Sequence, residues 1–306
     1  MVTPHFLDIG DTIGIVSTAR KITSIEVQPL IDLIEAWGLK YILGATINAE
    51  HNQYAGDDTT RTTDFQEMLD NPKVKAIWCG RGGYGTVRII DHLNFSGFIK
   101  NPKWIIGYSD VTVLHSHIHS FGIETLHANM AIDIDTKTEE TRRSIKTVLF
   151  GKGHKIVLSA KNELNRNGVA NGELVGGNLS ILYSLVGSPS ELTTRGKILF
   201  LEDLDEMYYH IDRMMQGLKR SGALENIIGL VVGGMNDMRD NVIPFGKTVQ
   251  EVISDAVAEY DFPVCFDFPS GHIHDNRALL LGREIHLTVS KNGVTLTFNQ
   301  KNAPIL

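Results

Sequence analysis

A serine lies where a predicted strand turns directly into a predicted helix, in the segment KWIIGYSDVTVLHSHIHSFG. Gly107 stands two residues before Ser109, and a glycine there permits the sharp turn that exposes a nucleophilic hydroxyl. The turn also places Ser109 beside the free N–H groups at the helix start, and that of Asp110 is the natural first donor to an oxyanion. Position 111 is valine, so the G-x-S-x-G pattern of a nucleophile elbow is incomplete. Ser109 is therefore either a nucleophile or a simple helix N-cap.

A glycine-rich run, RGGYG at 81–85, also follows a predicted strand and precedes a predicted helix. Its glycines let the backbone approach a ligand closely and offer N–H groups to an anion, so the run could form the second half of an oxyanion hole. The run lacks both the Walker lysine and the full G-x-G-x-x-G pattern. A phosphate cradle and a purely structural turn remain open, and no nucleotide site is predicted.

A catalytic triad also needs a base and a group that orients it, and the second half of the chain offers both. Glu202 ends the apolar run LFLED, and His272 follows another in FDFPSGHIHDN. A carboxylate at the end of an apolar strand is costly unless it is paired, which favours a partner such as an imidazole. Glu202 could equally pair with an arginine, and His272 is one of 12 histidines. The order Ser, Glu, His nevertheless matches one class of α/β hydrolases.

Short β-type runs alternate with helical periods through the first half of the chain. The predicted strands are TIGIVSTA, KYILGATI, KAIWCG and KWIIGYS, and the predicted helices are SIEVQPLIDLIEAWG, DDTTRTTDFQEMLDNP and TVRIIDHL. This alternation predicts an α/β fold with a parallel sheet, helices on both faces and a ligand crevice beyond the carboxyl ends of the strands. Both RGGYG and GYSD fall at such ends.

Between about 150 and 170 the pattern gives way to a polar segment rich in Lys, Asn and Gly, which is typical of a linker or an exposed hairpin. We therefore predict an amino-terminal α/β domain over 1–150 with the serine, a linker over 151–170, and a carboxyl-terminal domain over 171–306 with the glutamate and histidine. The chain ends in three predicted strands, FPVCFDFP, ALLLGREIHLTVS and GVTLTFNQ, with Asn292-Gly293 as a tight hairpin turn.

The composition limits the partners and the location. Among 306 residues, 36 acidic side chains outnumber 29 basic ones for a net charge of -7, and no Lys/Arg-rich run occurs. A small-molecule or peptide substrate is therefore expected, and a nucleic-acid partner is not. The first residues lack a secretory signal pattern and the apolar runs are strand-sized, so we expect a cytoplasmic protein that does not span a membrane. Cys79 and Cys265, both in apolar strand-like contexts, are expected to be reduced and buried.

Six blocks occur in order along the chain: GDTIGIVSTA, CGRGGYGTVRIIDHLN, IIGYSDVTVLH, GELVGGNLSIL, ILFLEDLDEMYYHIDRMMQGL and FPSGHIHDNRALLLG. Together they resemble the LD-carboxypeptidase family of serine peptidases, which includes the murein tetrapeptide carboxypeptidases and the microcin-immunity peptidases. The likeness runs nearly end to end. It implies an amino-terminal sandwich related to class I glutamine amidotransferases, a β-rich carboxyl-terminal domain, an active site at their junction and, as is usual in the family, a homodimer.

The resemblance also implies a reaction and its residues. Ser109 would be the nucleophile, His272 the general base and Glu202 the residue that orients the histidine. Ser109 would attack the carbonyl of an amide that joins an L-configured centre to a D-amino acid, His272 would take and return the proton, and water would resolve the acyl-enzyme. In the tetrapeptide carboxypeptidases the substrate is a recycled cell-wall peptide that loses its terminal D-alanine. Neither a metal nor an organic cofactor is implied.

The same resemblance assigns the oxyanion hole to the backbone N–H groups of Asp110 and of Gly82 or Gly83. Because such a substrate ends in a free carboxylate, we expect a cation or a helix end near the site, with Arg81 as the leading candidate. Tyr84 and the side chain of Asp110 are further candidates for the wall of the site. Core packing for Tyr84 and helix capping for Asp110 are their alternatives.

A microcin-immunity peptidase is the nearest alternative, because the same triad there acts on peptidyl-nucleotide antibiotics and aminoacyl-adenylate analogues. Those proteins carry an added loop with an aromatic side chain that stacks on the base. Here residues 171–201 contain Tyr183 but no tryptophan, which favours the cell-wall substrate.

Two other classes of function are weighed against these. A zinc hydrolase is suggested by His115, His117 and His119, and by His272 with His274. On a helix only the first and third of these share a face, and no glutamate follows in the H-E-x-x-H manner, so the zinc hypothesis is disfavoured. A binding protein of the same fold without catalysis is the other alternative, and the presence of all three triad residue types counts against it.

Overall fold

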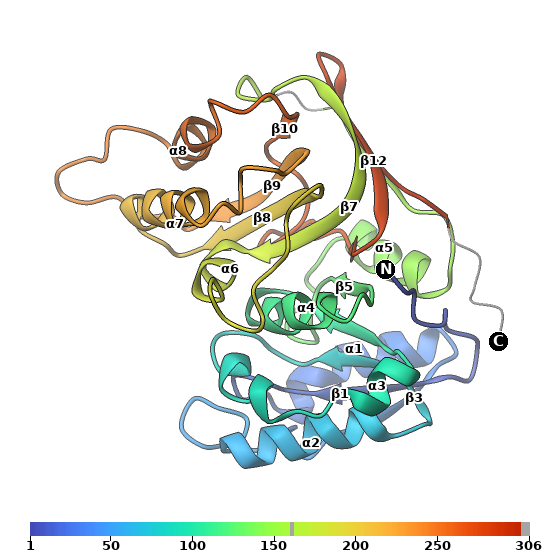
Figure 1. The fold of residues 1–306 in the computed structure, drawn as a ribbon. Helices are drawn as coiled ribbons and strands as arrows, with labels where there is room; N and C mark the ends of the chain where they lie inside the picture. The colour runs from blue at the N-terminus through green and yellow to red at the C-terminus, as the bar shows by residue number, and fades with distance from the viewer. Residues whose placement is uncertain (160–161, 301–306) are drawn as a thin grey trace.

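The computed structural model describes residues 1–159 and 162–300, which fold into two β-sheets with helices packed around them (Figure 1). The first sheet has the strand order β11-β5-β4-β3-β1-β2. Its strands are β1 (Thr12–Val16), β2 (Lys40–Leu43), β3 (Val74–Cys79), β4 (Trp104–Gly107), β5 (Thr125–His127) and β11 (Leu279–Leu281). The strands from the first half of the chain all run parallel, as predicted, and β11 pairs antiparallel with β5.

Helices cover both faces of this sheet. They are α1 (Ser24–Ala36), α2 (Asp58–Asp70), α3 (Ser96–Lys100), α4 (Thr112–His119) and α5 (Glu139–Leu149). Apolar side chains of α1 and α5 pack in one core cluster, and those of α2, α3 and α4 in another. Local sequence fixes where α1 and α2 begin, because Thr23 and Glu26 form a capping box and Asp57 accepts a hydrogen bond from the N–H of Thr60.

The helix predicted from TVRIIDHL is wrong. The segment forms two single turns of 3-10 helix, η1 (Thr86–Arg88) and η2 (Ile90–His92). The hydrogen bonds join residues three apart, as from the N–H of Arg88 to the carbonyl of Gly85 at 3.0 Å. That carbonyl also accepts from the guanidinium of Arg61 at 3.0 Å. The carbonyl of Gly85 thus accepts two hydrogen bonds, neither of them from the residue four positions later as in an α-helix. The segment is therefore a 3-10 helix.

The second sheet has the order β10-β9-β8-β7-β12-β13-β6. Strands β7 (Gly168–Asn178), β8 (Ile198–Leu204), β9 (Gly229–Asn236) and β10 (Val264–Cys265) are parallel. Strands β6 (Lys155–Leu158), β12 (Glu284–Ser290) and β13 (Gly293–Phe298) complete it with antiparallel pairs. Helices α6 (Leu179–Ser184), α7 (Tyr208–Arg220) and α8 (Val249–Ala256) pack on one face.

The segment ALLLGREIHLTVS, predicted as one strand, is divided between the two sheets. Its first part is β11 in the first sheet and its second part is β12 in the second. The break falls at Gly282, whose φ of +87° is left-handed, and at Arg283, which is buried and bonded to the carboxylate of Glu124 at 2.8 and 2.7 Å. The predicted hairpin is present but displaced by one residue: Ser290 lies opposite Gly293, the first residue of β13, so the two loop residues are Lys291 and Asn292.

The division of the chain at 150 and 170 stays a prediction. The predicted linker contains β6, which pairs with β13, and the first residues of β7. The first sheet takes its antiparallel edge strand from residues 279–281. The first sheet therefore includes a strand from the predicted carboxyl-terminal domain, and the second sheet includes a strand from the predicted linker.

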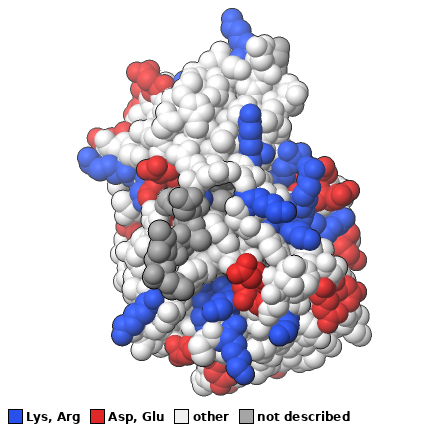
Figure 2. Space-filling view, turned by 90° about the vertical axis from the view of Figure 1, so that its right-hand side faces the viewer, with Lys and Arg blue, Asp and Glu red and all other residues white. Residues whose placement is uncertain are grey.

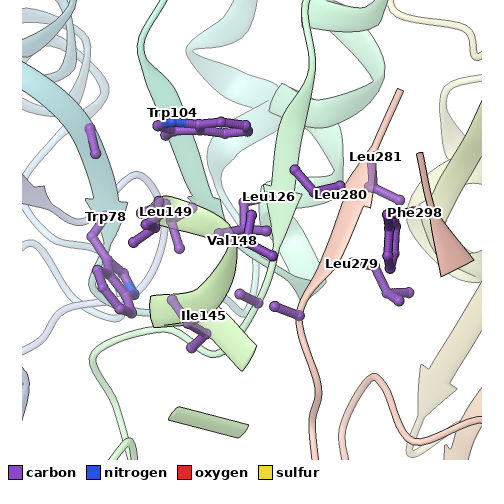
Figure 3. Close-up of a cluster of buried hydrophobic side chains, with 14 of the residues drawn as sticks. Trp78, Trp104, Leu126, Ile145, Val148, Leu149, Leu279, Leu280, Leu281 and Phe298 are labelled. Atoms are coloured by element: carbon purple, nitrogen blue, oxygen red, sulfur yellow. The ribbon is translucent and has the colours of Figure 1, made fainter. Parts of the chain in front are cut away.

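One apolar cluster connects the two sheets. Figure 3 shows side chains of β3, β4, β5, α5 and β11 packed together, with Phe298 of β13 at the edge. The same cluster contains Leu174, Phe200 and Val231 from the second sheet, so the face of that sheet without helices is covered by the first half of the molecule. Cys79 and Cys265 are free and buried, as predicted, and burial raises the pKa of Cys79 to about 12.

The surface carries charges of both signs. Figure 2 shows Lys and Arg side chains interspersed with Asp and Glu on one face of the molecule. Within the part of the chain that the structure describes, no helix has the length and apolar character needed to cross a membrane.

The buried ion pair at the break between β11 and β12 generates a test of stability. Arg283→Met should lower the free energy of unfolding by about 3 to 5 kcal/mol, because it leaves the carboxylate of Glu124 buried without this cation. Urea unfolding measures the change. Arg143→Met, which removes one member of an exposed pair with Glu140, is the control and should change stability by less than about 0.5 kcal/mol. Equal effects of the two substitutions would show that burial does not set the strength of the first pair.

Candidate active site

Ser109 occupies a strained turn between β4 and α4. The strand ends at Gly107, and Ser109 begins a single 3-10 turn, η3 (Ser109–Val111), with a φ of +61°. A Cβ at Gly107 would lie 2.8 Å from a methyl carbon of Val111, so this turn requires glycine there. No side-chain cap precedes η3 or α4, and the N-cap positions are Tyr108 and Val111. Ser109 is therefore not a helix N-cap, and its left-handed backbone is the kind of strain found at nucleophile elbows.

The glycine-rich run lies directly against this serine. A Cβ at Gly82 would be 3.1 Å from Cβ and 3.2 Å from Oγ of Ser109, closer than most side-chain contacts in proteins. Gly83 follows with a φ of +105°. Gly82 and Ser109 are 27 positions apart in the sequence, but β3 and β4, which precede them, are neighbours in the sheet. The glycine-rich run and the Ser109 turn therefore lie together in one candidate site.

Buried polar side chains hold the run in place. The carboxylate of Asp110 accepts a hydrogen bond from the N–H of Thr86 at 2.8 Å. Burial raises the pKa of Asp110, and this effect outweighs the opposite effect of the hydrogen bond. Arg61, fully buried, donates to the carbonyls of Thr18 at 2.7 Å and Gly85 at 3.0 Å. The side chain of Asp110 therefore joins the Ser109 turn to the first N–H of η1, directly after the glycine-rich run, and does not cap α4.

Glu202 and His272 form the second half of the site. Nδ1 of His272 lies 2.6 Å from Oε2 of Glu202, and the backbone N–H of His272 donates to the same oxygen at 3.2 Å. Glu202 is fully buried on β8, and the side chain of His272 is 12% exposed. Gly271 makes this approach possible, because a Cβ there would lie 2.7 Å from Cβ of Glu202.

Charge and burial oppose each other in this pair. Burial raises the pKa of Glu202, but the charge and the hydrogen bond of His272 outweigh it and the net pKa is lowered. Burial lowers the pKa of His272, but the charge and hydrogen bond of Glu202 outweigh it and the net pKa is raised. The carboxylate is thus ionised, and it holds Nδ1 of the imidazole so that Nε2 remains for chemistry.

Aromatic and backbone contacts bring the two halves together. The ring of His272 lies 4.6 Å, between centroids, from that of Tyr108, the residue before Ser109. At the carboxyl end of β7, Asn178 lies opposite Glu202 in the β7–β8 register, and its N–H donates to the hydroxyl of Thr112 in α4 at 3.1 Å. The carboxyl ends of β4, β7 and β8 therefore meet at one place, as expected for ligand sites in parallel sheets.

The structure places the two predicted substrate contacts at the surface of the glycine-rich run. Arg81 is 3.5 Å from the carboxylate of Glu26, and both side chains are 36% exposed. Tyr84 is 46% exposed and its ring lies 6.4 Å from that of Tyr54. Tyr84 is thus not a core residue, and the role of both side chains in binding substrate stays a prediction.

The histidines behind the zinc hypothesis have structural partners. His115 bonds to the carbonyl of Gly107 at 2.9 Å, His117 to Ser190 and His119 to Thr125. Burial lowers the pKa of His115 to about 3, so it stays neutral. Among the residues described, no group of three His, Cys, Asp or Glu side chains could hold a metal ion.

Sequence reasoning missed the residues that support the site. Arg61 reads as an ordinary helix-surface arginine, yet it is buried beneath the glycine-rich run. Asn178 could have been noticed as the N-cap of α6 in GGNLS, where it accepts from the N–H of Ile181, but its bond to Asp203 at 2.9 Å has no local signal. Both depend on contacts between distant segments.

Known proteins match most of this chain in sequence. Residues 13–128 match the LD-carboxypeptidase N-terminal domain, and residues 171–287 match the LD-carboxypeptidase C-terminal domain. The chain belongs to the LD-carboxypeptidase family. The resemblance inferred from the six sequence blocks is therefore confirmed.

Three proteins illustrate the range of this LD-carboxypeptidase family. The chain is 35% identical to the probable murein peptide carboxypeptidase of Bacillus subtilis (strain 168), over 94% of this chain and 92% of that protein. The crystal structure of muramoyltetrapeptide carboxypeptidase from Oxalobacter formigenes, 25% identical, superposes with a TM-score of 0.87 over 96% of this chain and 100% of that one. The microcin C7 self-immunity protein MccF of Escherichia coli is 24% identical over 95% of this chain and 94% of that protein.

The backbone strain at Ser109 can be measured in this LD-carboxypeptidase family member. Ser109→Gly should be more stable than Ser109→Ala by about 0.5 to 1 kcal/mol. Alanine pays a steric penalty at positive φ that glycine avoids, and this penalty exceeds the larger entropy loss of glycine on folding. Urea unfolding of the two variants gives the difference. At Ser254, inside α8, the order should reverse, with the glycine variant about 1 kcal/mol less stable. The same order at both positions would contradict strain at Ser109.

Proposed function

We propose that this protein is a serine carboxypeptidase that hydrolyses the amide between an L-configured centre and a terminal D-amino acid. The observation that carries the proposal is the 2.6 Å contact between His272 and the buried Glu202, beside a serine held at positive φ. A nucleophile, a base and a group that orients the base are the parts that acyl transfer requires. The names of the relatives support a carboxypeptidase.

In the proposed reaction, Oγ of Ser109 attacks the scissile carbonyl as Nε2 of His272 takes its proton. The imidazolium is stabilised by Glu202, and it returns the proton to the leaving amine. The oxyanion is held by the backbone N–H of Asp110 and by that of Gly82 or Gly83. Water, activated by the same histidine, then releases the acyl group and restores the serine. These steps need neither a metal nor an organic cofactor.

The proposed substrate is a murein tetrapeptide, which loses its terminal D-alanine. Its support is the relative named as a murein peptide carboxypeptidase and the matched structure of a muramoyltetrapeptide carboxypeptidase. The free carboxylate of such a substrate requires a cation, for which Arg81 is the sequence-based candidate, and Tyr84 would line the site. A cytoplasmic location and a homodimer, expected from the sequence and the family, complete the proposal.

A microcin-immunity activity on peptidyl- or aminoacyl-nucleotide amides is the second candidate. The likeness to MccF of Escherichia coli favours it. Against it, Tyr183, the aromatic noted between residues 171 and 201, packs on α7, where a Cβ at Gly217 would lie 2.3 Å from its ring. The ring is therefore partly covered by α7, with the residue 37% exposed, and no tryptophan is present in this stretch, so the cell-wall peptide remains the first proposal.

The reaction is tested by incubating the protein with a murein tetrapeptide that ends in D-alanine and quantifying the released D-alanine. The wild type should release it, and Ser109→Ala should lower the rate by about 10³-fold or more because the nucleophile is lost. If the folded wild type releases none but hydrolyses a peptidyl-adenylate, the second candidate replaces the first. Binding of the tetrapeptide without release of D-alanine would instead indicate a non-catalytic protein of this fold.

The pH dependence tests the role of the Glu202–His272 pair. His272 acts as a base only when neutral, and its pKa is raised above 6.5, so kcat/KM should fall as the pH drops through a value above 6.5. Glu202→Gln removes the charge that raises this pKa, so the acid limb should move to lower pH while the plateau falls by about 100-fold or more. Glu206→Gln, on the same segment, is the control and should leave the limb in place. An acid limb that does not move in Glu202→Gln would contradict the assignment.

A further inference from the structure

Four arginines surround the glycine-rich run, and three of them have acidic partners. Arg61 is buried and bonded to Asp58, and Arg88 binds the same carboxylate at 2.6 Å. Arg81 lies 3.5 Å from Glu26. The fourth is Arg20, which is exposed. Among the residues that the structure describes, its guanidinium has neither a hydrogen-bonding partner nor an acidic one.

Arg20 lies directly on the proposed oxyanion segment. Its backbone N–H donates to the carbonyl of Gly82 at 3.3 Å, and its own carbonyl accepts from the hydroxyl of Ser17 at 2.6 Å. A Cβ at Gly83 would lie 2.5 Å from Cδ and 2.7 Å from Nε of Arg20. The arginine side chain therefore rests on the backbone of Gly83, while the preceding glycine contacts Ser109.

This position suits the end of a substrate. In a peptide that is cut one residue from its carboxyl terminus, three bonds separate the scissile carbonyl carbon from the terminal carboxylate carbon, a span of roughly 4 Å. Successive Cα atoms along the glycine-rich run are also about 3.8 Å apart. If the leaving residue extends along the run from a carbonyl bound beside Gly82, its terminal carboxylate lies near Gly83, over which Arg20 lies.

We propose that the guanidinium of Arg20 binds the terminal carboxylate of the leaving amino acid and so restricts cleavage to the last residue of the peptide. The inference rests on the proposed carboxypeptidase function and adds the residue that selects for a free end. A guanidinium suits this role because its planar fork donates two parallel hydrogen bonds to a carboxylate. Arg81, in contrast, shares its charge with Glu26.

The experiment compares two murein tetrapeptides, one ending in free D-alanine and one in D-alaninamide, with wild type and Arg20→Gln. The wild type should prefer the free acid by about 10- to 100-fold in kcat/KM, the range expected for a charged hydrogen-bonded pair. Arg20→Gln should lose about that factor on the free acid, through KM more than kcat, but less than about 3-fold on the amide. The two substrates then become nearly equivalent. Arg20→Lys should recover part of the preference, since it restores the charge without the fork.

Lys21→Gln is the matched control. It removes one positive charge at the next position, where Lys21 pairs with Glu50 at the surface, and it should keep the wild-type preference. Loss of the preference in Lys21→Gln as well would assign the effect to general charge and overturn the inference. The inference would also be overturned if the preference for the free acid survives Arg20→Gln. Loss of that preference in Arg81→Gln would then assign the carboxylate to Arg81. If the wild type hydrolyses neither peptide, the proposed function itself fails and the inference with it.

Discussion

A carboxylate that is completely removed from water governs the architecture of this site. Glu202 lies within β8, an interior strand of the second sheet, where an isolated charge would be unstable, so an imidazole must be brought to it. The loop that carries His272 reaches it only because Gly271 has no side chain. The same imidazole packs on Tyr108, which precedes Ser109 in the turn after β4 of the first sheet. One buried charge thus links both halves of the molecule at the point where the chemistry is proposed.

The other half of the site depends on a different kind of support. The glycine-rich run has little side-chain mass of its own, and buried groups hold the backbone at its carboxyl end. The guanidinium of Arg61 donates to the carbonyl of Gly85, and the carboxylate of Asp110 accepts from the N–H of Thr86. Backbone N–H groups fixed in this way need little reorganisation when charge develops on a substrate. The strained turn at Ser109 and the glycine-rich run are therefore both held in place before a substrate binds.

Much of this arrangement was predictable from local sequence, and the exceptions have physical causes. The parallel sheet followed from the alternation of apolar strands and amphipathic helices, and the start of α1 from its capping box. The position of Ser109 just after a strand is a local feature too. Glu202 instead lies within β8 and His272 in the loop after β10, and the roles of all three came from a family resemblance. The 3-10 turns after RGGYG, the burial of Arg61 and the break at Gly282 could not be predicted in this way. Each depends on a partner far away in the sequence, which a local pattern does not encode.

The placement of β11 has a consequence for the order in which the protein is made on the ribosome. Strand β5 ends at His127, but its antiparallel neighbour consists of residues 279–281, so the first sheet has an open edge until about 150 more residues have been added. At typical synthesis rates this takes roughly 10 to 30 s. During that interval the nascent chain exposes an apolar edge strand, which is the kind of surface that pairs with other chains or recruits chaperones. Completion of the amino-terminal sheet is thus a late event in synthesis, although its other strands are made first.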